Sequence, residues 1–297
     1  MIFGNLFGVF AEMTGETTGE TTGETLSATP APSPSTQGFL VLIGGNEDKR
    51  DAKKVLRRVA TLRPSTCVAV IPTASMYGAE LGEEYVDLFL RMNIGITKGH
   101  VLDVRNAQDT SNPALVSMIE EADVIFFTGG DQVRLVQAFA GSAVLQAIYA
   151  KFAQGATIAG TSAGAAAASN PMMYDGDEEG FNKGSVQQCE GFGFLPNITV
   201  DTHFLQRNRI PRLAQMLSRG SSSFGVGLDE DTAIVVSPNL HCEVIGSAMV
   251  TFMHAKNLRY SNYNDVRNGA LYGTDGLDIS FLTEGMKFDL NTWRVIV

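Results

Sequence analysis

Cysteine and positive charge are both scarce in this chain. Its 297 residues include only three cysteines, Cys67, Cys189 and Cys242, too few and too scattered to predict a disulfide framework or a zinc site. Cys67 and Cys242 lie in apolar runs, which favours buried thiols. Lys and Arg number 22 against 32 Asp and Glu, giving a net charge of −10. This balance argues against nucleic acid or an anionic membrane as a partner.

Long apolar runs are also missing. No stretch approaches the ~20 residues of a membrane span. The first 13 residues are mildly apolar but contain no Lys or Arg, and Glu12 and Glu16 stand where a secretory cleavage site would lie. We therefore expect a cytoplasmic protein.

The N-terminal region is of low complexity. Residues 14–25 read TGET three times, and a tract rich in Ser, Thr and Pro follows. Such a composition cannot bury an apolar face, so residues 1–36 are predicted to be a disordered tail. Residues 37–297 are predicted to form a single catalytic α/β domain.

Beyond the tail, short apolar runs alternate with helical patterns. This alternation predicts a doubly wound, mainly parallel sheet. The expected strands are 39–43, 67–71, 101–104, 124–127 and 157–160, and the expected helices are 51–61, 79–92, 113–121, 132–152 and 163–169. Four further short strands, at 224–228, 232–236, 243–245 and 249–253, are expected to extend or cap the sheet in an antiparallel sense.

Glycine-rich segments follow three of the predicted strands. They are Gly44-Gly45, Gly129-Gly130 and Gly160–Gly164. Ligands of such sheets bind at the carboxyl ends of the strands. Gly44-Gly45 is either a tight turn or a phosphate-binding turn, although the full dinucleotide fingerprint and a Walker-type Gly-Lys-Ser are absent.

The sequence GTSAG at 160–164 predicts a nucleophile elbow with Ser162 at its tip. The alternative is that Ser162 only caps the following helix. A nucleophilic serine needs a base, and His203, at the end of the predicted strand that includes Ile198–Val200, is the best placed of the four histidines. A third group should orient the imidazole, and the loop 175–179 offers four carboxylates for this role.

An oxyanion hole needs preorganised donors, commonly two backbone N–H groups. Ala163 follows the serine at a predicted helix N-terminus and can supply one of them. Gly129 or Gly130 can supply the other, because glycine lets the backbone approach a substrate closely.

Five motifs in this order resemble those of the cyanophycinases, serine exopeptidases of the family that also holds aspartyl dipeptidase (peptidase E). The motifs span much of residues 38–297 and read GGNEDK at 44–49, FTGGDQ at 127–132, GTSAG at 160–164, DTHFLQRNR at 201–209 and GLDEDTA at 227–233. The resemblance implies a fold like that of class I glutamine amidotransferases. It also implies hydrolysis of cyanophycin, a polyaspartate with arginine on each β-carboxyl, to β-Asp-Arg dipeptides. A homodimer is implied as well, and no metal or cofactor.

Applied residue by residue, the resemblance makes Ser162 the nucleophile and His203 the base. Matching the acidic loop favours Glu179 as the third member, or Glu178 if the alignment shifts by one residue. Three further residues match substrate-binding positions: Gln132, Asp201 and Arg207. Asp201 and Arg207 could instead form a structural ion pair. Glu47 and Asp48 either contribute to a site for the guanidinium or belong to a solvated turn. The chain departs from the expected pattern at Asn46, where another glycine would be typical.

Three alternatives to a cyanophycin hydrolase stay open. An aspartyl dipeptidase would act on short Asp-X peptides. An α/β-hydrolase esterase shares the Gly-x-Ser-x-Gly motif, but its acid and histidine should lie nearer the C-terminus. A catalytically inactive protein would only bind aspartyl-arginine peptides.

Overall fold

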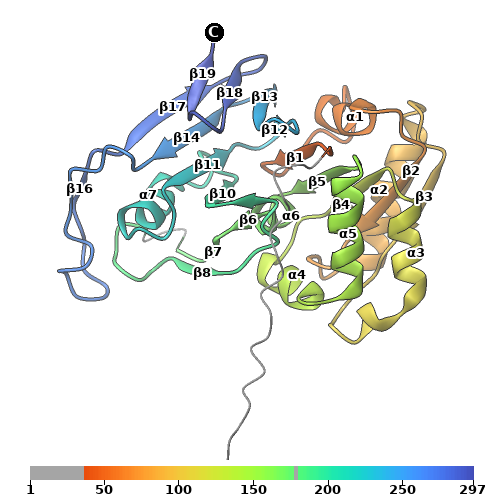
Figure 1. Ribbon diagram of the computed structural model, residues 1–297, viewed down its shortest axis with the longest axis horizontal. Helices are drawn as coiled ribbons and strands as arrows, with labels where there is room; N and C mark the ends of the chain where they lie inside the picture. Colours follow the sequence, from red (N-terminus) through yellow and green to blue (C-terminus); the bar gives the residue numbers. More distant parts are fainter. Residues whose placement is uncertain (1–36, 177–179) are drawn as a thin grey trace, which may run out of the picture.

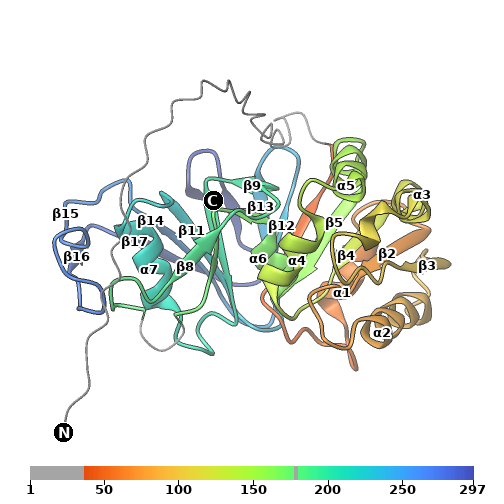
Figure 2. The same cartoon turned by 90° about the horizontal axis from the view of Figure 1, so that it is seen from below.

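The computed structural model describes residues 37–176 and 180–297. The predicted tail and residues Asp177, Glu178 and Glu179 lie outside the described residues. Within them, two sheets stand side by side, with helices packed on their faces (Figures 1 and 2). No single helix there is long and apolar enough to cross a membrane.

The larger sheet has nine strands with a parallel centre. From edge to edge they are β19 (Arg294–Ile296), β18 (Lys287–Asp289), β13 (His241–Gly246), β12 (Thr232–Val236), β1 (Leu40–Ile43), β5 (Thr157–Thr161), β4 (Val124–Phe127), β2 (Cys67–Ile71) and β3 (Lys98–Val101). Strands β1, β5, β4, β2 and β3 are parallel, whereas β12, β13, β18 and β19 join antiparallel. The central strands are buried on both faces, which explains their continuous apolar runs.

Helices cover both faces of this sheet. On one face α1 (Lys54–Thr61) and α2 (Gly78–Arg91) enclose an apolar cluster that includes Val41 and Ile43. On the other face lie α3 (Pro113–Glu121), α4 (Gln132–Phe139), α5 (Ala143–Ala153) and α6 (Ala163–Ala167), packed over Leu40 and Leu42. The alternation of the β1 side chains between two cores makes the fold doubly wound, as predicted.

The second sheet has six strands and its own helix. Its order is β17 (Asp278–Leu282), β14 (Val250–His254), β11 (Phe224–Leu228), β10 (Ile198–Thr202), β6 (Ser169–Asn170) and β9 (Leu195–Pro196). One face shares the large core of the first sheet through Val200, Val226 and Phe252, and α7 (Ile210–Ser218) packs on the other. The short pairs β7 (Met172–Tyr174) with β8 (Gln187–Cys189) and β15 (Tyr260–Ser261) with β16 (Thr274–Asp275), and the 3₁₀ turn η1 (Asp109–Ser111), complete the described elements.

The predicted elements occur in the predicted order, but helix α7 and the short strands β6 to β9 and β15 to β19 were not predicted, and three predictions differ from the structure. The strand expected at 101–104 lies at Lys98–Val101, where backbone pairing with β2 rather than apolar character sets its bounds. The single helix expected over 132–152 is two helices bent by 98°. Gly141 at φ 68° and the N-cap Ser142, whose hydroxyl accepts from Leu145 N–H, separate them. The late strands build a second sheet as well as extending the first.

The buried thiols are as expected. Cys67 and Cys242 are 3% and 2% exposed, and Cys189 is half-buried. All three cysteines are free.

Candidate active site

Ser162 stands on a sharp turn between β5 and α6. Its φ of 51° and ψ of −111° are far from the conformations that an ordinary residue adopts. A Cβ at Gly160 would lie 2.5 Å from the Gly164 backbone, and one at Gly164 would lie 2.5 Å from the Phe127 carbonyl oxygen. Only glycine fits at both positions, so the GTSAG segment folds as a strained elbow that exposes the serine.

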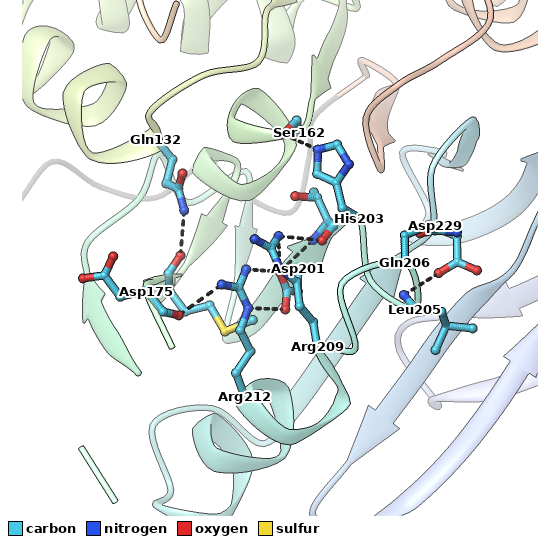
Figure 3. A network of polar contacts seen from close by, with 12 residues as sticks. Gln132, Ser162, Asp175, Asp201, His203, Leu205, Gln206, Arg209, Arg212 and Asp229 are labelled. Carbon is cyan, nitrogen blue, oxygen red and sulfur yellow. Dashed lines mark hydrogen bonds and ion pairs between the residues drawn. The ribbon is translucent and has the colours of Figure 1, made fainter. Parts of the chain in front are cut away.

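Ser162, which follows β5 of the first sheet, faces His203, which follows β10 of the second sheet. The Ser162 Oγ lies 2.9 Å from His203 Nε2, a hydrogen-bonding distance (Figure 3). His203 directly follows β10 and itself has a positive φ of 47°. Its N–H donates to the Gly44 carbonyl at 2.8 Å, while the Ser162 N–H donates to the Ile43 carbonyl at 2.9 Å. The end of β1 therefore holds both residues by their backbones.

The other imidazole nitrogen meets Glu230. His203 Nδ1 lies 2.7 Å from Glu230 Oε1, and the second carboxylate oxygen accepts from Asn46 Nδ2 at 2.9 Å. The Glu230 N–H donates to Gln206 Oε1 at 3.1 Å. Serine, histidine and carboxylate thus form one continuous series of hydrogen bonds, the arrangement in which a histidine can take a proton from a serine.

The position of Glu230 follows from strand pairing. Strands β10 and β11 are parallel, with Thr202 opposite Leu228. His203 and Asp229 are therefore the first residues beyond a matched pair of strand ends, and Glu230 is the second. The motif GLDEDTA contained this signal, but it could be used only if β10 and β11 were known to be neighbours. Glu179, the predicted third member, lies outside the described residues.

The electrostatic surroundings favour a neutral imidazole. Burial lowers the pKa of His203 below its ordinary value of 6.5, and the cations Arg207 and Arg209 lower it further, against the opposing effect of Glu230. The hydrogen bond with His203 lowers the pKa of Glu230 below its ordinary value of 4.5. At neutral pH the pair is thus an uncharged base beside a carboxylate anion.

The Gly44-Gly45 turn makes room for the histidine. A Cβ on Gly45, whose φ is 99°, would lie 2.4 Å from His203 Cε1, and one on Gly44 would lie 2.0 Å from the Asp229 carbonyl oxygen. The turn is a tight one that brackets the imidazole. Asn46, the departure from the glycine-rich pattern, supplies the hydrogen bond to Glu230.

The predicted oxyanion donors surround the serine. A Cβ on Gly129 would lie 3.3 Å from Ser162 Cβ and 3.8 Å from its Oγ, so this backbone is in contact with the nucleophile position. Gly130 has a φ of 141° and packs on the Ala74 carbonyl. Ala163 opens α6, where backbone N–H groups lack partners within the helix. The N–H groups of Gly129 and Gly130 donate to no acceptor among residues 37–176 and 180–297.

Of the predicted substrate residues, Asp201 is buried and Arg207 is exposed. Asp201 is 1% exposed and accepts from Arg212 Nε at 2.7 Å, with Arg209 Nη1 at 3.5 Å (Figure 3). The predicted alternative of an ion pair with Arg207 is not what Asp201 makes, since its partners are Arg209 and Arg212. Arg207 is exposed, and its side chain forms no ion pair with the described residues.

Gln132, Glu47 and Asp48 have different surroundings. Gln132 Nε2 donates to the Met173 carbonyl at 3.3 Å. Glu47 is 5% exposed and accepts hydrogen bonds from the Tyr85 hydroxyl and, at 2.6 Å, from Thr161 Oγ1. The Asp48 carboxylate accepts from three backbone N–H groups between Arg50 and Lys53, which lower its pKa to about 2.

Two hollows open near the elbow, and Ser162 lines the first of them. One, of about 790 Å³, is bounded by Ser162, Gly129 and the charged segment 46–51 with Glu84. The other, of about 640 Å³, is bounded by Gly130, Gln132, Arg209 and Arg212. The first hollow is lined by charged groups of both signs, and the second has two arginines and Asp131 and Asp175 in its lining.

The site is of the kind that serine hydrolases use. A serine on a strained elbow, a histidine and a carboxylate are joined by hydrogen bonds at the ends of parallel strands. The signature of peptidase family S51 matches residues 40–240. This chain belongs to that family, and it is a serine-type peptidase.

Among similar curated proteins, the cyanophycinase of Geminocystis herdmanii is 34% identical over 257 residues, covering 85% of this chain and 94% of that protein. Those of Nostoc sp. and Trichormus variabilis are each 31% identical over 260 residues, covering 86% of this chain and 87% of each relative. A crystal structure of a peptidase from an acI-B1 Actinobacterium shares the fold, with a TM-score of 0.63 and 23% identity over 86% of this chain and 98% of that one. The predicted resemblance is confirmed, and an α/β-hydrolase esterase is not favoured.

Proposed function

We propose that this peptidase hydrolyses cyanophycin, multi-L-arginyl-poly-L-aspartate, and releases β-Asp-Arg dipeptides from one end of the polymer. The observation that carries the proposal is the hydrogen-bonded series Ser162, His203 and Glu230, in a chain whose similar curated relatives are named cyanophycinases.

The mechanism follows from the geometry of the two hydrogen bonds. His203 Nε2 takes the proton of Ser162 Oγ as that oxygen attacks the scissile backbone carbonyl. The tetrahedral intermediate then collapses, and His203 returns the proton to the leaving amine. Water, activated by the same imidazole, hydrolyses the acyl-enzyme. A His203 pKa below its ordinary value keeps the base unprotonated at neutral pH.

Glu230 is the acidic member in this proposal, in place of the expected Glu179. Its carboxylate fixes the tautomer in which Nδ1 carries the proton, and its charge stabilises the imidazolium that forms during attack. Asn46 holds the second carboxylate oxygen, which keeps the first one directed at His203. Four separate chain segments, carrying Asn46, Ser162, His203 and Glu230, thus cooperate on one proton transfer.

The oxyanion hole is assigned to the N–H of Ala163 and the N–H groups of the Gly129-Gly130 turn. Close contact of Gly129 with the Ser162 side chain supports this assignment, because a carbonyl bound to Oγ would lie beside that backbone. Glycine at both positions leaves no side chain between the donors and the substrate.

Substrate binding is assigned to the two hollows. Each unit of the polymer carries an arginine carboxylate and a guanidinium. One hollow is bounded by Gln132, Arg209 and Arg212. The buried carboxylate of Asp201 accepts hydrogen bonds from both arginines and stabilises their positions. In this proposal Arg207, exposed beside His203, grips a carboxylate of the substrate. Glu47 and Asp48 bound the acidic side of the other hollow, although their carboxylates already serve Thr161 and the local turn.

A product assay tests the proposal. Purified protein is incubated separately with cyanophycin, with plain poly-aspartate and with α-linked Asp-X dipeptides, and the products are identified by mass. We expect β-Asp-Arg from cyanophycin and slow turnover of poly-aspartate, which lacks the guanidinium. Fast turnover of the dipeptides without any action on cyanophycin would instead establish an aspartyl dipeptidase. A covalent serine probe that fails to label Ser162 would indicate an inactive binding protein.

The homodimer and the cytoplasmic location stay predictions. Light scattering on the purified full chain tests the first, with a mass near twice 31.8 kDa as the expected result. Fractionation of the source cells tests the second.

A further inference from the structure

A second cluster of chemically reactive side chains lies away from the peptidase site. Cys67 is the first residue of β2, His100 lies on the edge strand β3, and Glu121 ends α3. One ligand atom from each residue, a sulfur, a ring nitrogen and a carboxylate oxygen, lies within 4.8 Å of the other two. The scattered cysteines gave no expectation of a metal site, but the fold adds a histidine and a carboxylate to one of them.

The parallel pairing of β2 and β3 brings these groups together. Cys67 lies opposite Lys98 and Ala69 lies opposite His100. Residues two apart on a strand point to the same face, so Cys67 shares the face of Ala69, which belongs to the core under α3. The C-terminal end of α3 then presents Glu121 to this face. His100 Nε2 lies 2.8 Å from Glu121 Oε2.

We propose that Cys67, His100 and Glu121 bind one Zn²⁺ ion. A thiolate sulfur, an imidazole nitrogen and a carboxylate oxygen are ligands that zinc accepts together, whereas Ca²⁺ and Mg²⁺ require oxygen. Ligand atoms of a tetrahedral zinc ion are roughly 3.3–3.8 Å apart, given zinc–ligand distances of about 2.0–2.3 Å. The three ligand atoms lie within 4.8 Å of one another, near this spacing, and water completes the fourth position.

Lys98 is the competitor for this site. Its ammonium donates a hydrogen bond to Glu121 Oε1. Because the Lys98 side chain is 53% exposed, it can turn toward solvent when zinc takes its place. On binding, the Cys67 Sγ–H bond breaks, its proton passes to solvent, and the sulfur bonds the metal. No electron transfer is involved.

The site is structural rather than catalytic. Cys67 lies at the amino end of β2, whereas Ser162 follows the carboxyl end of the parallel strand β5, so the two sites lie at opposite edges of the sheet. Figure 1 shows β2, β3 and α3 together at the end of the molecule remote from β16. A zinc ion there would tie the edge strand β3 to β2 and α3, and hydrolysis would not depend on it.

The experiment uses cobalt as a spectroscopic probe. Untagged, metal-free protein is titrated with Co²⁺ and then with Zn²⁺. We expect one Co²⁺ per chain, with a thiolate-to-cobalt charge-transfer band and the visible bands of four-coordinate cobalt, and displacement of both by Zn²⁺. At a 100-fold excess over its dissociation constant, Zn²⁺ should raise the thermal midpoint by about 5 °C or more.

Three variants remove the ligands singly: Cys67→Ser, His100→Ala and Glu121→Gln. Each should weaken Zn²⁺ binding about tenfold or more, and Cys67→Ser should abolish the thiolate band. Cys189→Ser is the matched control and should leave the band unchanged. Lys98→Met, which removes the competing cation, should tighten binding by about threefold to fivefold.

Three outcomes would overturn the proposal: no cobalt band, a band that survives Cys67→Ser, or Zn²⁺ affinity equal in the wild type and all three variants. Circular dichroism of each variant checks that it folds, and failure of one variant to fold leaves the other two to decide. Because the readouts are spectroscopic and thermal, failure of this proposal is distinguishable from failure of the proposed peptidase reaction.

Discussion

Glu230→Gln should remove most of the peptidase activity while leaving the fold intact. The substitution keeps the shape of the side chain and an oxygen that can accept from Asn46, but it removes the charge that faces His203 Nδ1 at 2.7 Å. A glutamine can also present its NH₂ to Nδ1, which would favour the tautomer with the proton on Nε2, where the serine proton has to go.

The size of the effect can be bounded from the structure. Replacing the acidic member of a serine protease triad by its amide lowers kcat by about 10⁴-fold. The Glu230 side chain is 30% exposed, so solvent screens part of its charge. We therefore expect a loss of about 10²- to 10⁴-fold in kcat/KM, which corresponds to roughly 3 to 5 kcal/mol of transition-state stabilisation. Since Glu230 opposes the lowering of the His203 pKa, the kinetic pKa should also move to a lower pH.

The assay compares Glu230→Gln with Glu179→Gln on cyanophycin across pH, with circular dichroism to verify folding. A loss in Glu230→Gln together with near wild-type activity in Glu179→Gln is the expected result. The reverse order would refute the geometric assignment and restore Glu179 as the orienting acid. Equal and mild losses would show that neither carboxylate stabilises the imidazolium.

The remaining predictions concern other parts of the site. Ser162→Ala should lower kcat by about 10⁴-fold or more without changing the circular dichroism spectrum, and retention of a tenth of the activity would exclude Ser162 as nucleophile. The kcat/KM profile should fall with acid through a midpoint below 6.5, because burial lowers the pKa of His203; a midpoint above that value would contradict this direction. Gly45→Ala should displace the imidazole and also destabilise the protein by about 1 kcal/mol or more, measured by hydrolysis and thermal unfolding, because its φ is 99° and the new Cβ would lie 2.4 Å from His203. Arg207→Lys should raise KM by about tenfold without moving the kinetic pKa, since its charge is retained; an unchanged KM would remove Arg207 from substrate binding.

Several buried strands of both sheets were predictable because their evidence is local. Strands 67–71, 124–127, 224–228 and 232–236 have the predicted bounds, since each is a short apolar run between turns. Strand β3 is polar and partly exposed, and only its pairing with β2 defines it, so its bounds were wrong. The break in the helix over 132–152 was signalled by Gly141 and Ser142, but helical periodicity on both sides hid it.

The elbow and its histidine were found for different reasons. Ser162 was found because glycines must surround a strained serine, and that requirement is written in five consecutive residues. His203 was found because, of the four histidines, it is the one at the end of a predicted apolar strand, where a base could face Ser162. Both residues could be recognised without knowing which strands are neighbours in space.

Glu230 could be placed beside His203 only with that knowledge, whereas the acidic loop was chosen from sequence order alone, and the role of Glu179 stays a prediction. Loop 175–179 lies between the serine and the histidine in sequence, whereas Glu230 lies beyond both. The sequence order of strands does not determine their order in a sheet, and here a strand of the second sheet, β11, lies parallel to β10 and delivers Glu230 beside His203. The same holds for Asn46. From sequence it is only a departure from a glycine-rich turn, and its role becomes visible when β1 is known to end beside His203 and Glu230. Residues whose roles depend on strand neighbours can therefore be assigned only after the register is known, whereas residues whose roles depend on local backbone strain are readable in advance.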